Sequence, residues 1–137
     1  AWRKRRCVIL ANGFYEWRAA GKGSGSKTPY YIARADEAPI GFAGLWERWE
    51  KGEAPLETCT IITTAANRRL RDIHDRMPVI LAPEVLRTWV DPGQPPEVLK
   101  ALLQPAADEL LTTREVSRAV NSPAHEGAGL IAASSGG

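Results

Sequence analysis

The feature that most limits the possible folds of this chain is its succession of short apolar segments, separated by glycine, proline or asparagine residues. The segments are rich in β-branched and aromatic residues, a composition that favours strands. The segment "TCTIITTAA" has the strongest pattern of this kind and is predicted to be a buried strand. Six strands are predicted, at residues 7–11, 14–17, 28–34, 39–49, 58–66 and 113–120.

Three short helices are predicted between and after these strands. Asn67 is a suitable N-cap for a helix at 68–74, and Pro83 suits the first turn of a helix at 82–90. A third helix is predicted at 95–105. Strands and helices do not alternate in a βαβ pattern, so we expect an α+β fold with a mostly antiparallel, barrel-like sheet and a few short helices.

The composition is that of a globular protein. The chain has 137 residues, of which 44% are hydrophobic and 25% are charged, enough for one domain with a hydrophobic core. No apolar run approaches the roughly 18 to 20 residues that a membrane-spanning helix needs. Cys7 and Cys59 lie in apolar segments and are predicted to be buried thiols, so we expect a reducing compartment. Residues 133–137 are predicted to form a disordered tail.

The positive charge is concentrated near the start of the sequence. Residues 1–34 contain eight lysines and arginines against one acid, Glu16, a net charge of +7. The other residues contain ten lysines and arginines against fifteen acids, a net charge of −5. This imbalance indicates an anionic partner for the basic segment. The alternative is a solvated basic surface that only improves solubility.

The segment "ANGFYEW" places a carboxylate inside an aromatic strand. Asn12-Gly13 predicts a turn, and the alternation after it puts Glu16 on the same face as Phe14 and on the opposite face from Trp17. A carboxylate in apolar surroundings must be paired or hydrogen-bonded, or its pKa rises. Glu16 is therefore either the partner of a neighbouring arginine or a general acid or base, with Trp17 as a ring on which a ligand stacks.

The segment "RDIHDRMPVIL" places a histidine between two carboxylates. Asp72 and Asp75 could fix the tautomer of His74 and raise its basicity, although a lone histidine often has only a structural role. Arginines beside exposed aromatic rings are what single-stranded nucleic acid binding requires, because bases stack on rings while cations contact phosphates. The arginines around this segment are Arg68, Arg69, Arg71 and Arg76. We find no phosphate-binding loop, dinucleotide fingerprint or metal-binding motif, so no cofactor and no metal are predicted.

Three longer stretches resemble the SOS-response-associated peptidase (SRAP) family. They are "RRCVILANGFYEW", "TIITTAANRRLRDIHDRMPVIL" and "REVSRAVNSP", and their order and spacing agree with successive motifs of that family. The resemblance extends over nearly the whole chain, and the pair "GFYEW" and "IHDRMP" is highly specific to the family. It implies that residues 1–132 form the C-terminal portion of a single SRAP-like domain.

The resemblance implies a protein that senses abasic sites in single-stranded DNA. In that family an N-terminal cysteine, exposed by self-removal of the initiator methionine, attacks the ring-opened sugar aldehyde and closes a protective thiazolidine crosslink. Glu16 matches the active-site glutamate, an acid or base for the Schiff-base steps and for methionine removal. His74 matches the histidine that assists ring opening and crosslink reversal, and Trp17, Thr63 and Arg76 match positions along the DNA path. The implied localisation is cytoplasmic, on the nucleoid when bound to DNA, without a membrane or a small-molecule cofactor.

The sequence departs from the family pattern at its start. The Met-Cys-Gly-Arg start and the Asn-Ala-Arg-x-Glu segment of the family do not occur in it, and Asn12 stands where an aspartate is usual. We therefore expect this chain to hold the acid and base residues, Glu16 and His74, without the nucleophile. Neither Cys7 nor Cys59 is N-terminal, so the chain alone is expected to be inactive in crosslinking, with an exposed sheet edge that promotes self-association.

Two other functions agree with the same residues. The chain could be a non-catalytic module that binds single-stranded DNA through its basic and aromatic surface, which an assay of crosslinking to abasic DNA would distinguish. It could also be a conventional hydrolase that uses Glu16 and His74, although the sequence shows no nucleophile or metal ligands for that reaction.

Overall fold

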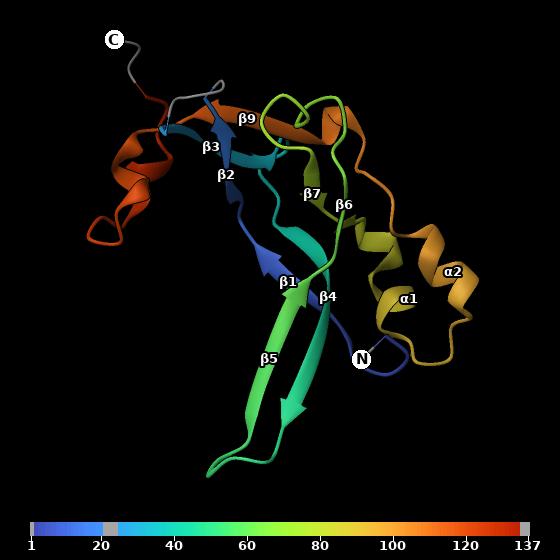
Figure 1. Ribbon diagram of the computed structural model, residues 1–137. Helices are drawn as coiled ribbons and strands as arrows, with labels where there is room; N and C mark the ends of the chain where they lie inside the picture. The colour runs from blue at the N-terminus through green and yellow to red at the C-terminus, as the bar shows by residue number, and fades with distance from the viewer. Residues whose placement is uncertain (1, 21–24, 135–137) are drawn as a thin grey trace.

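The computed structural model describes residues 2–20 and 25–134, and its strands form three separate antiparallel sheets (Figure 1). The first sheet contains β1 (Arg6–Ala11), β4 (Ile40–Trp49), β5 (Leu56–Ile61) and β8 (Ile80–Leu81). The second contains β2 (Phe14–Ala19), β3 (Lys27–Arg34) and β9 (Leu111–Glu115), and the third pairs β6 (Thr63–Ala65) with β7 (Arg76–Pro78). The antiparallel α+β prediction is confirmed, but within the described residues no sheet closes into a barrel.

The helices are short. The α-helices are α1 (Leu86–Val90) and α2 (Pro96–Ala101). The 3-10 helices are Pro83–Val85, Asp108–Leu110, Arg118–Asn121 and Ala128–Ile131. No helix in the described ranges is long and apolar enough to cross a membrane.

The alternation along β4 divides the core into two hydrophobic clusters. Neighbouring residues of a strand point to opposite faces, so Phe42 joins one cluster and Ala43 joins the other. The Phe42 cluster lies toward the second sheet and includes Ile32 of β3 and Met77 of β7. The Ala43 cluster is formed with the helices, and Trp89 of α1 is fully buried in it. The antiparallel β4 therefore supports both layers of the molecule.

Gly13 is the point where the chain passes from the first sheet to the second. The predicted turn at Asn12-Gly13 is present as a bend, with β1 paired to β4 and β2 paired to β3. A Cβ atom at Gly13 would lie 2.4 Å from the side chain of Tyr31 and 2.7 Å from the carbonyl oxygen of Ile32. Only glycine lets these two backbone segments approach so closely.

One predicted helix and one predicted strand differ from the structure. Residues 68–73 form hydrogen-bonded turns in place of a helix, although Asn67 does act as a cap, because its Oδ1 accepts from the backbone N–H of Leu70 at 3.1 Å. The strand predicted at 113–120 ends at Glu115, because Ser117 caps the 3-10 helix Arg118–Asn121 by accepting from the N–H of Ala119.

The predicted buried strand at 58–66 is wrong in its burial. All six residues of β5 are exposed, including Cys59, because β5 is an edge of its sheet and projects with β4 away from the other elements (Figure 1). Cys7 is half-buried, and burial, together with the nearby Cys59, raises the pKa of its thiol. An apolar strand pattern therefore indicates a strand here but does not indicate what covers it.

Two residues of the predicted tail at 133–137 have backbone partners. Ala133 pairs with Val116, and the N–H of Ser134 donates to the carbonyl of Glu115 at 3.0 Å, so these two residues are held against the end of β9. The remainder of the predicted tail, residues 135–137, lies outside the described residues.

Candidate active site

An open cleft of about 710 Å³ lies beside the edge strand β2. It brings together two residues that are far apart in the sequence and were both predicted as catalytic, Glu16 and His74. Trp17, predicted as a DNA-binding residue, lines the same cleft. The other lining residues come from the start of β3 and from the segment after β9, and they are Gly25, Ser26, Lys27, Arg118, Val120, Asn121 and Pro123.

Glu16 reaches the cleft because β2 is an edge strand, with β3 as its neighbour among the described strands. Its register partner on β3 is Tyr30, and Phe14 on the same face packs edge-on against Phe42 at 5.6 Å between ring centroids. Glu16 and Trp17 therefore belong to opposite faces of β2, as the alternation predicted. At the free edge of the sheet, side chains from both faces can line one cleft.

The carboxylate of Glu16 is half-buried and forms no ion pair with any residue in the described ranges. Its hydrogen-bond donor is the backbone N–H of Trp17, 3.3 Å from Oε1. The alternative in which an arginine neutralises Glu16 therefore finds no support in the ion pairs of the described residues. A carboxylate without a cationic partner can accept or donate a proton to a bound ligand.

His74 is held by the backbone of the residue two positions later. Its Nδ1 lies 3.1 Å from the N–H of Arg76, 3.2 Å from the carbonyl oxygen of Arg76 and 3.4 Å from Oδ1 of Asp75. Asp72 makes no ion pair with it among the described contacts, so only one of the two predicted carboxylates is placed beside the ring. Nδ1 accepts from the N–H when the ring is neutral and can donate to the carbonyl when it is protonated.

This arrangement leaves the other ring nitrogen of His74 for chemistry. No described residue forms a hydrogen bond with Nε2, and the imidazole is exposed on the cleft. In the tautomer whose hydrogen is on Nδ1 and is donated to the carbonyl oxygen of Arg76, the ring can gain and lose a proton at Nε2 without reorienting. A histidine held in this way is suited to proton transfer.

Trp17 is fixed by a residue that sequence reasoning did not single out. The indole N–H of Trp17 donates to Oδ1 of Asn121 at 2.5 Å, and the Trp17 ring lies 6.2 Å from the ring of Tyr15. Asn121 lies in the motif "REVSRAVNSP", which was used for the family resemblance but was assigned no role. The 3-10 helix that contains Asn121 thus sets the orientation of the Trp17 indole ring in the cleft.

The other two predicted DNA-binding residues lie next to the cleft and not in its lining. The guanidinium of Arg76 donates to the carbonyl oxygen of Thr63 at 3.0 Å and to its hydroxyl at 3.2 Å, across the β6–β7 pair. Both residues are exposed. Arg76 adjoins His74 through the backbone contacts described above, so Thr63, Arg76 and His74 form a continuous polar surface at the cleft.

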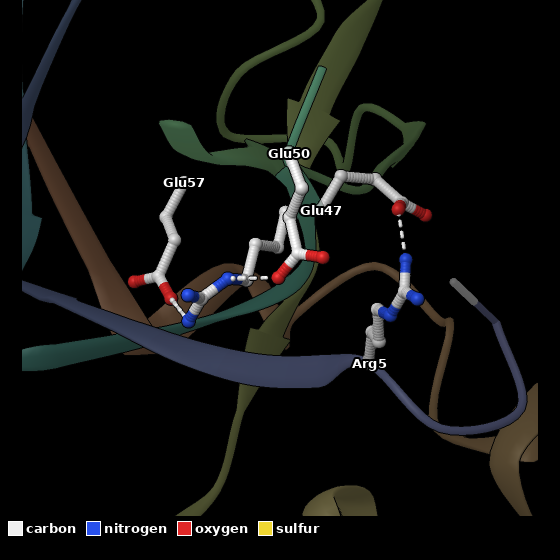
Figure 2. Close-up of polar contacts among 5 residues, drawn as sticks. Arg5, Glu47, Glu50 and Glu57 are labelled. Atoms are coloured by element: carbon white, nitrogen blue, oxygen red, sulfur yellow. Dashed lines mark hydrogen bonds and ion pairs between the residues drawn. The ribbon is translucent and has the colours of Figure 1, made fainter. Parts of the chain in front are cut away.

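Three of the eight lysines and arginines of the predicted basic segment have acceptors or ion-pair partners within the protein. Arg6 is buried, and its guanidinium donates to the carbonyls of Trp2, Arg3, Trp89 and Asp91. Figure 2 shows Arg5 paired with Glu47 beside the ion pairs that Arg48 makes with Glu50 and Glu57. Arg34 is paired with Asp36, which lowers the pKa of that carboxyl.

The cleft has two cations, one from the predicted basic segment and one from the segment after β9. Lys27 and Arg118 line it, and neither forms an ion pair within the part of the chain that the structure describes. The same part of the chain contains no cluster of three or more histidine, cysteine or acidic side chains that could hold a metal ion.

Comparisons with known proteins give a consistent result. The family model described as "SOS response associated peptidase (SRAP)" matches residues 1–123. The "Abasic site processing protein YoaM" of Bacillus subtilis is 43% identical over 129 residues, which cover 93% of this chain and 56% of that protein. The "Abasic site processing protein YedK" of Escherichia coli is 35% identical over 138 residues, which cover 95% of this chain and 58% of that protein.

A solved structure supports the same fold. A crystal structure of a protein from Bacteroides thetaiotaomicron matches with a TM-score of 0.85 and 28% identity, covering 97% of this chain and 58% of that one. The chain therefore spans somewhat more than half the length of the relatives that it matches.

Proposed function

The chain belongs to the SOS response associated peptidase family, and from that premise we propose that it processes abasic sites in single-stranded DNA. The observation that carries this proposal is the meeting of Glu16, His74 and Trp17 in one cleft. The names of the relatives, which are abasic site processing proteins, support the choice of substrate.

The reaction begins with opening of the abasic sugar. The closed sugar is a hemiacetal, and opening requires removal of the proton from its C1 hydroxyl and addition of a proton to its ring oxygen. Glu16 accepts the first proton, and His74 supplies the second from Nε2. The protonated ring keeps its position because Nδ1 can donate to the carbonyl oxygen of Arg76, 3.2 Å away. The product is a free aldehyde, which an amine or a thiol can attack.

The surrounding residues bind the strand. Trp17 offers an aromatic ring on which a base next to the lesion can stack, and Asn121 holds that ring in place. Arg76 and Thr63 form an exposed polar pair that is suited to binding the phosphate next to the stacked base. Such a site favours single-stranded DNA, because the bases of a duplex are already stacked on each other.

The proposal extends to the protective crosslink and the self-cleaving peptidase activity that the family resemblance implies. The thiazolidine ring closes through a thiol and an amine of the same residue. The backbone nitrogens of Cys7 and Cys59 are both in peptide bonds, so neither residue can form it. The crosslink therefore needs a cysteine with a free α-amine, while Glu16 and His74 supply the proton transfers.

The test compares oligonucleotides of one sequence, with and without one abasic site, incubated with the wild type, Glu16→Gln or His74→Ala. We expect aldehyde formation, followed with an aldehyde-reactive hydroxylamine, to be faster in the complex with the wild-type protein than in the free abasic strand. Each variant should lose about 100-fold of that acceleration, within the range for general acid–base catalysis. Binding, measured by fluorescence anisotropy, should stay within about twofold, because neither side chain is a permanent cation that neutralises phosphate.

Two results would count against this proposal. Equal binding of intact and abasic strands, with no acceleration of ring opening, would leave only a general module for single-stranded DNA. Loss of circular dichroism in Glu16→Gln or His74→Ala would assign the affected residue a structural role instead.

A further inference from the structure

Lys27 lies in the same cleft as Glu16 and His74, and no part of the proposed function uses it. Resting on that proposed function, we propose that the Lys27 amine attacks the aldehyde of the opened abasic sugar, forms an imine and cleaves the strand by β-elimination. This inference adds a second fate for the substrate. The lesion can be cut by a lysine of the cleft as well as shielded by a crosslink through a cysteine.

The position of Lys27 singles it out from the other lysines that the structure describes. Lys27 begins β3 and pairs with Ala19 at the end of β2, two residues before Pro29, which pairs with Trp17. Residues two apart along a strand share a face, and so do paired residues of neighbouring strands. Lys27 therefore lies on the same face of the sheet as Trp17, at the next pair along that face. Lys27 lines the cleft together with Trp17, Glu16 and His74, so a sugar bound there lies in the same cleft as its amine.

The other described lysines lie elsewhere. Lys4 lines a separate hollow with Trp2 and Pro92, Lys51 follows β4 and precedes β5, and Lys100 belongs to α2. The side chain of Lys27 is exposed and has no carboxylate partner in the described ion pairs, so nothing there neutralises or anchors its amine.

The steps use only groups of this cleft and water. The unprotonated amine adds to the C1 carbon of the aldehyde, and one of its protons moves to the aldehyde oxygen. His74 gives a second proton to the resulting hydroxyl, so that water leaves and a protonated imine remains. Glu16 or His74 then removes a proton from C2. The electron pair forms a C2–C3 double bond, and the C3–O bond breaks, releasing the DNA fragment on the 3′ side with a 5′-phosphate. Water finally hydrolyses the imine, which restores Lys27 and leaves an unsaturated aldehyde on the other fragment.

The experiment incubates the 137-residue chain with an end-labelled single strand that contains one abasic site, with and without sodium cyanoborohydride. The reductant converts the imine into a stable amine, so a protein–DNA adduct is expected only where it is present. Peptide mass spectrometry should locate the adduct on Lys27. Without reductant the strand should be cut at the lesion, faster as the pH rises, because only an unprotonated amine attacks.

Lys27→Arg is the decisive variant, because it keeps the positive charge but has no nucleophilic amine. It should reduce both the yield of trapped adduct and the rate of cleavage by at least about tenfold. Lys100→Ala should leave both unchanged. If Lys27→Arg formed as much trapped adduct as the wild type, or if the adduct were on another lysine, the inference would be overturned.

A strand with a tetrahydrofuran in place of the abasic sugar separates this inference from the proposed function. That analogue fits the same cleft but has no aldehyde. If the protein prefers it to an intact strand and yet forms no adduct with the true abasic strand, the role of Lys27 is refuted while the proposed function stands. If the protein shows no preference and forms no adduct, both proposals fail.

Discussion

The arginines near the start of the chain and the cations around the cleft have the same charge but opposite surroundings. Arg6 is buried with four carbonyl acceptors around its guanidinium, and Arg5 is paired with Glu47. Lys27 and Arg118 line an open cleft without ion pairs in the described residues. The first group holds the fold together, and the second is available to a ligand.

The difference shows why net charge by segment is a weak guide to a binding surface. Residues 1–34 have a net charge of +7, yet several of those charges are satisfied within the protein. A polyanion is bound by cations that are exposed and unpaired, because pairing already neutralises the others. The binding surface is therefore better predicted from exposed cations without ion-pair partners than from the net charge of a segment.

The largest effect that would test this contrast is the loss of Arg6. Arg6→Ala should lower the free energy of unfolding by about 3 kcal/mol or more, because it leaves the four carbonyls around its guanidinium without a donor inside the protein. The matched variant Arg118→Ala should change stability by no more than about 0.5 kcal/mol, as expected for an exposed residue. Urea denaturation followed by tryptophan fluorescence measures both. Equal stability of the two variants would remove the distinction.

The next effect concerns the stacking ring. Trp17→Ala should weaken binding of a single strand by about 1 to 3 kcal/mol, the range for loss of one base–aromatic stack. Asn121→Ala should cause a smaller loss, because the ring stays but its indole N–H is no longer held. Trp49→Ala serves as a control, since Trp49 is exposed but lies at the end of β4 and does not line the cleft. Anisotropy titrations measure the affinity of each variant. An equal loss of affinity in Trp49→Ala and Trp17→Ala would contradict the assignment.

A smaller effect separates the cations by their salt dependence. Removing one cation that contacts phosphate lowers the slope of log K against log salt by about 0.7 for a single strand. We expect that change for Arg118→Ala and for Arg76→Ala, and none for Arg5→Ala, whose guanidinium is paired with Glu47. Titrations at several salt concentrations provide the slopes. A reduced slope in Arg5→Ala alone would place the DNA beside Arg5 and away from the cleft.

The smallest effect compares the two thiols. Cys59 is exposed on β5, whereas Cys7 is half-buried with a raised pKa, so iodoacetamide should modify Cys59 several-fold faster at neutral pH. A raised pKa leaves less of Cys7 as the reactive thiolate at that pH, and the difference should narrow as the pH rises. Peptide mass spectrometry against time measures both rates, and faster labelling of Cys7 would contradict the described burial.

The sequence predicted the strands better than it predicted their burial. Alternation along "FYEW" correctly placed Glu16 and Trp17 on opposite faces, because that pattern follows from strand geometry alone. The burial of Cys59 was predicted wrongly, because it depends on whether another element covers β5, and no local pattern contains that information.

For the candidate site, too, local patterns were recognised from the sequence and long-range contacts were not. Glu16 and His74 were recognised from motifs, and the structure brings both to one cleft with Trp17. Lys27 and Asn121 were not recognised, since a lysine after a glycine-rich segment and an asparagine before a serine have no distinctive pattern. Their positions follow from the β2–β3 register and from the packing of the segment after β9, which are long-range contacts.

The most direct test of the central claim is to map the bound strand by nuclear magnetic resonance. A single strand with one tetrahydrofuran abasic analogue is titrated into ¹⁵N-labelled protein, whose five tryptophans provide separate indole N–H signals. The account predicts the largest shift at the Trp17 indole, with backbone shifts at Glu16, Lys27 and His74. The indoles of Trp2 and Trp89, beside the buried Arg6, should stay unchanged. Shifts concentrated on the indoles of Trp2 and Trp89 and on the backbone of residues 3–6, with no shift at Trp17, would contradict it.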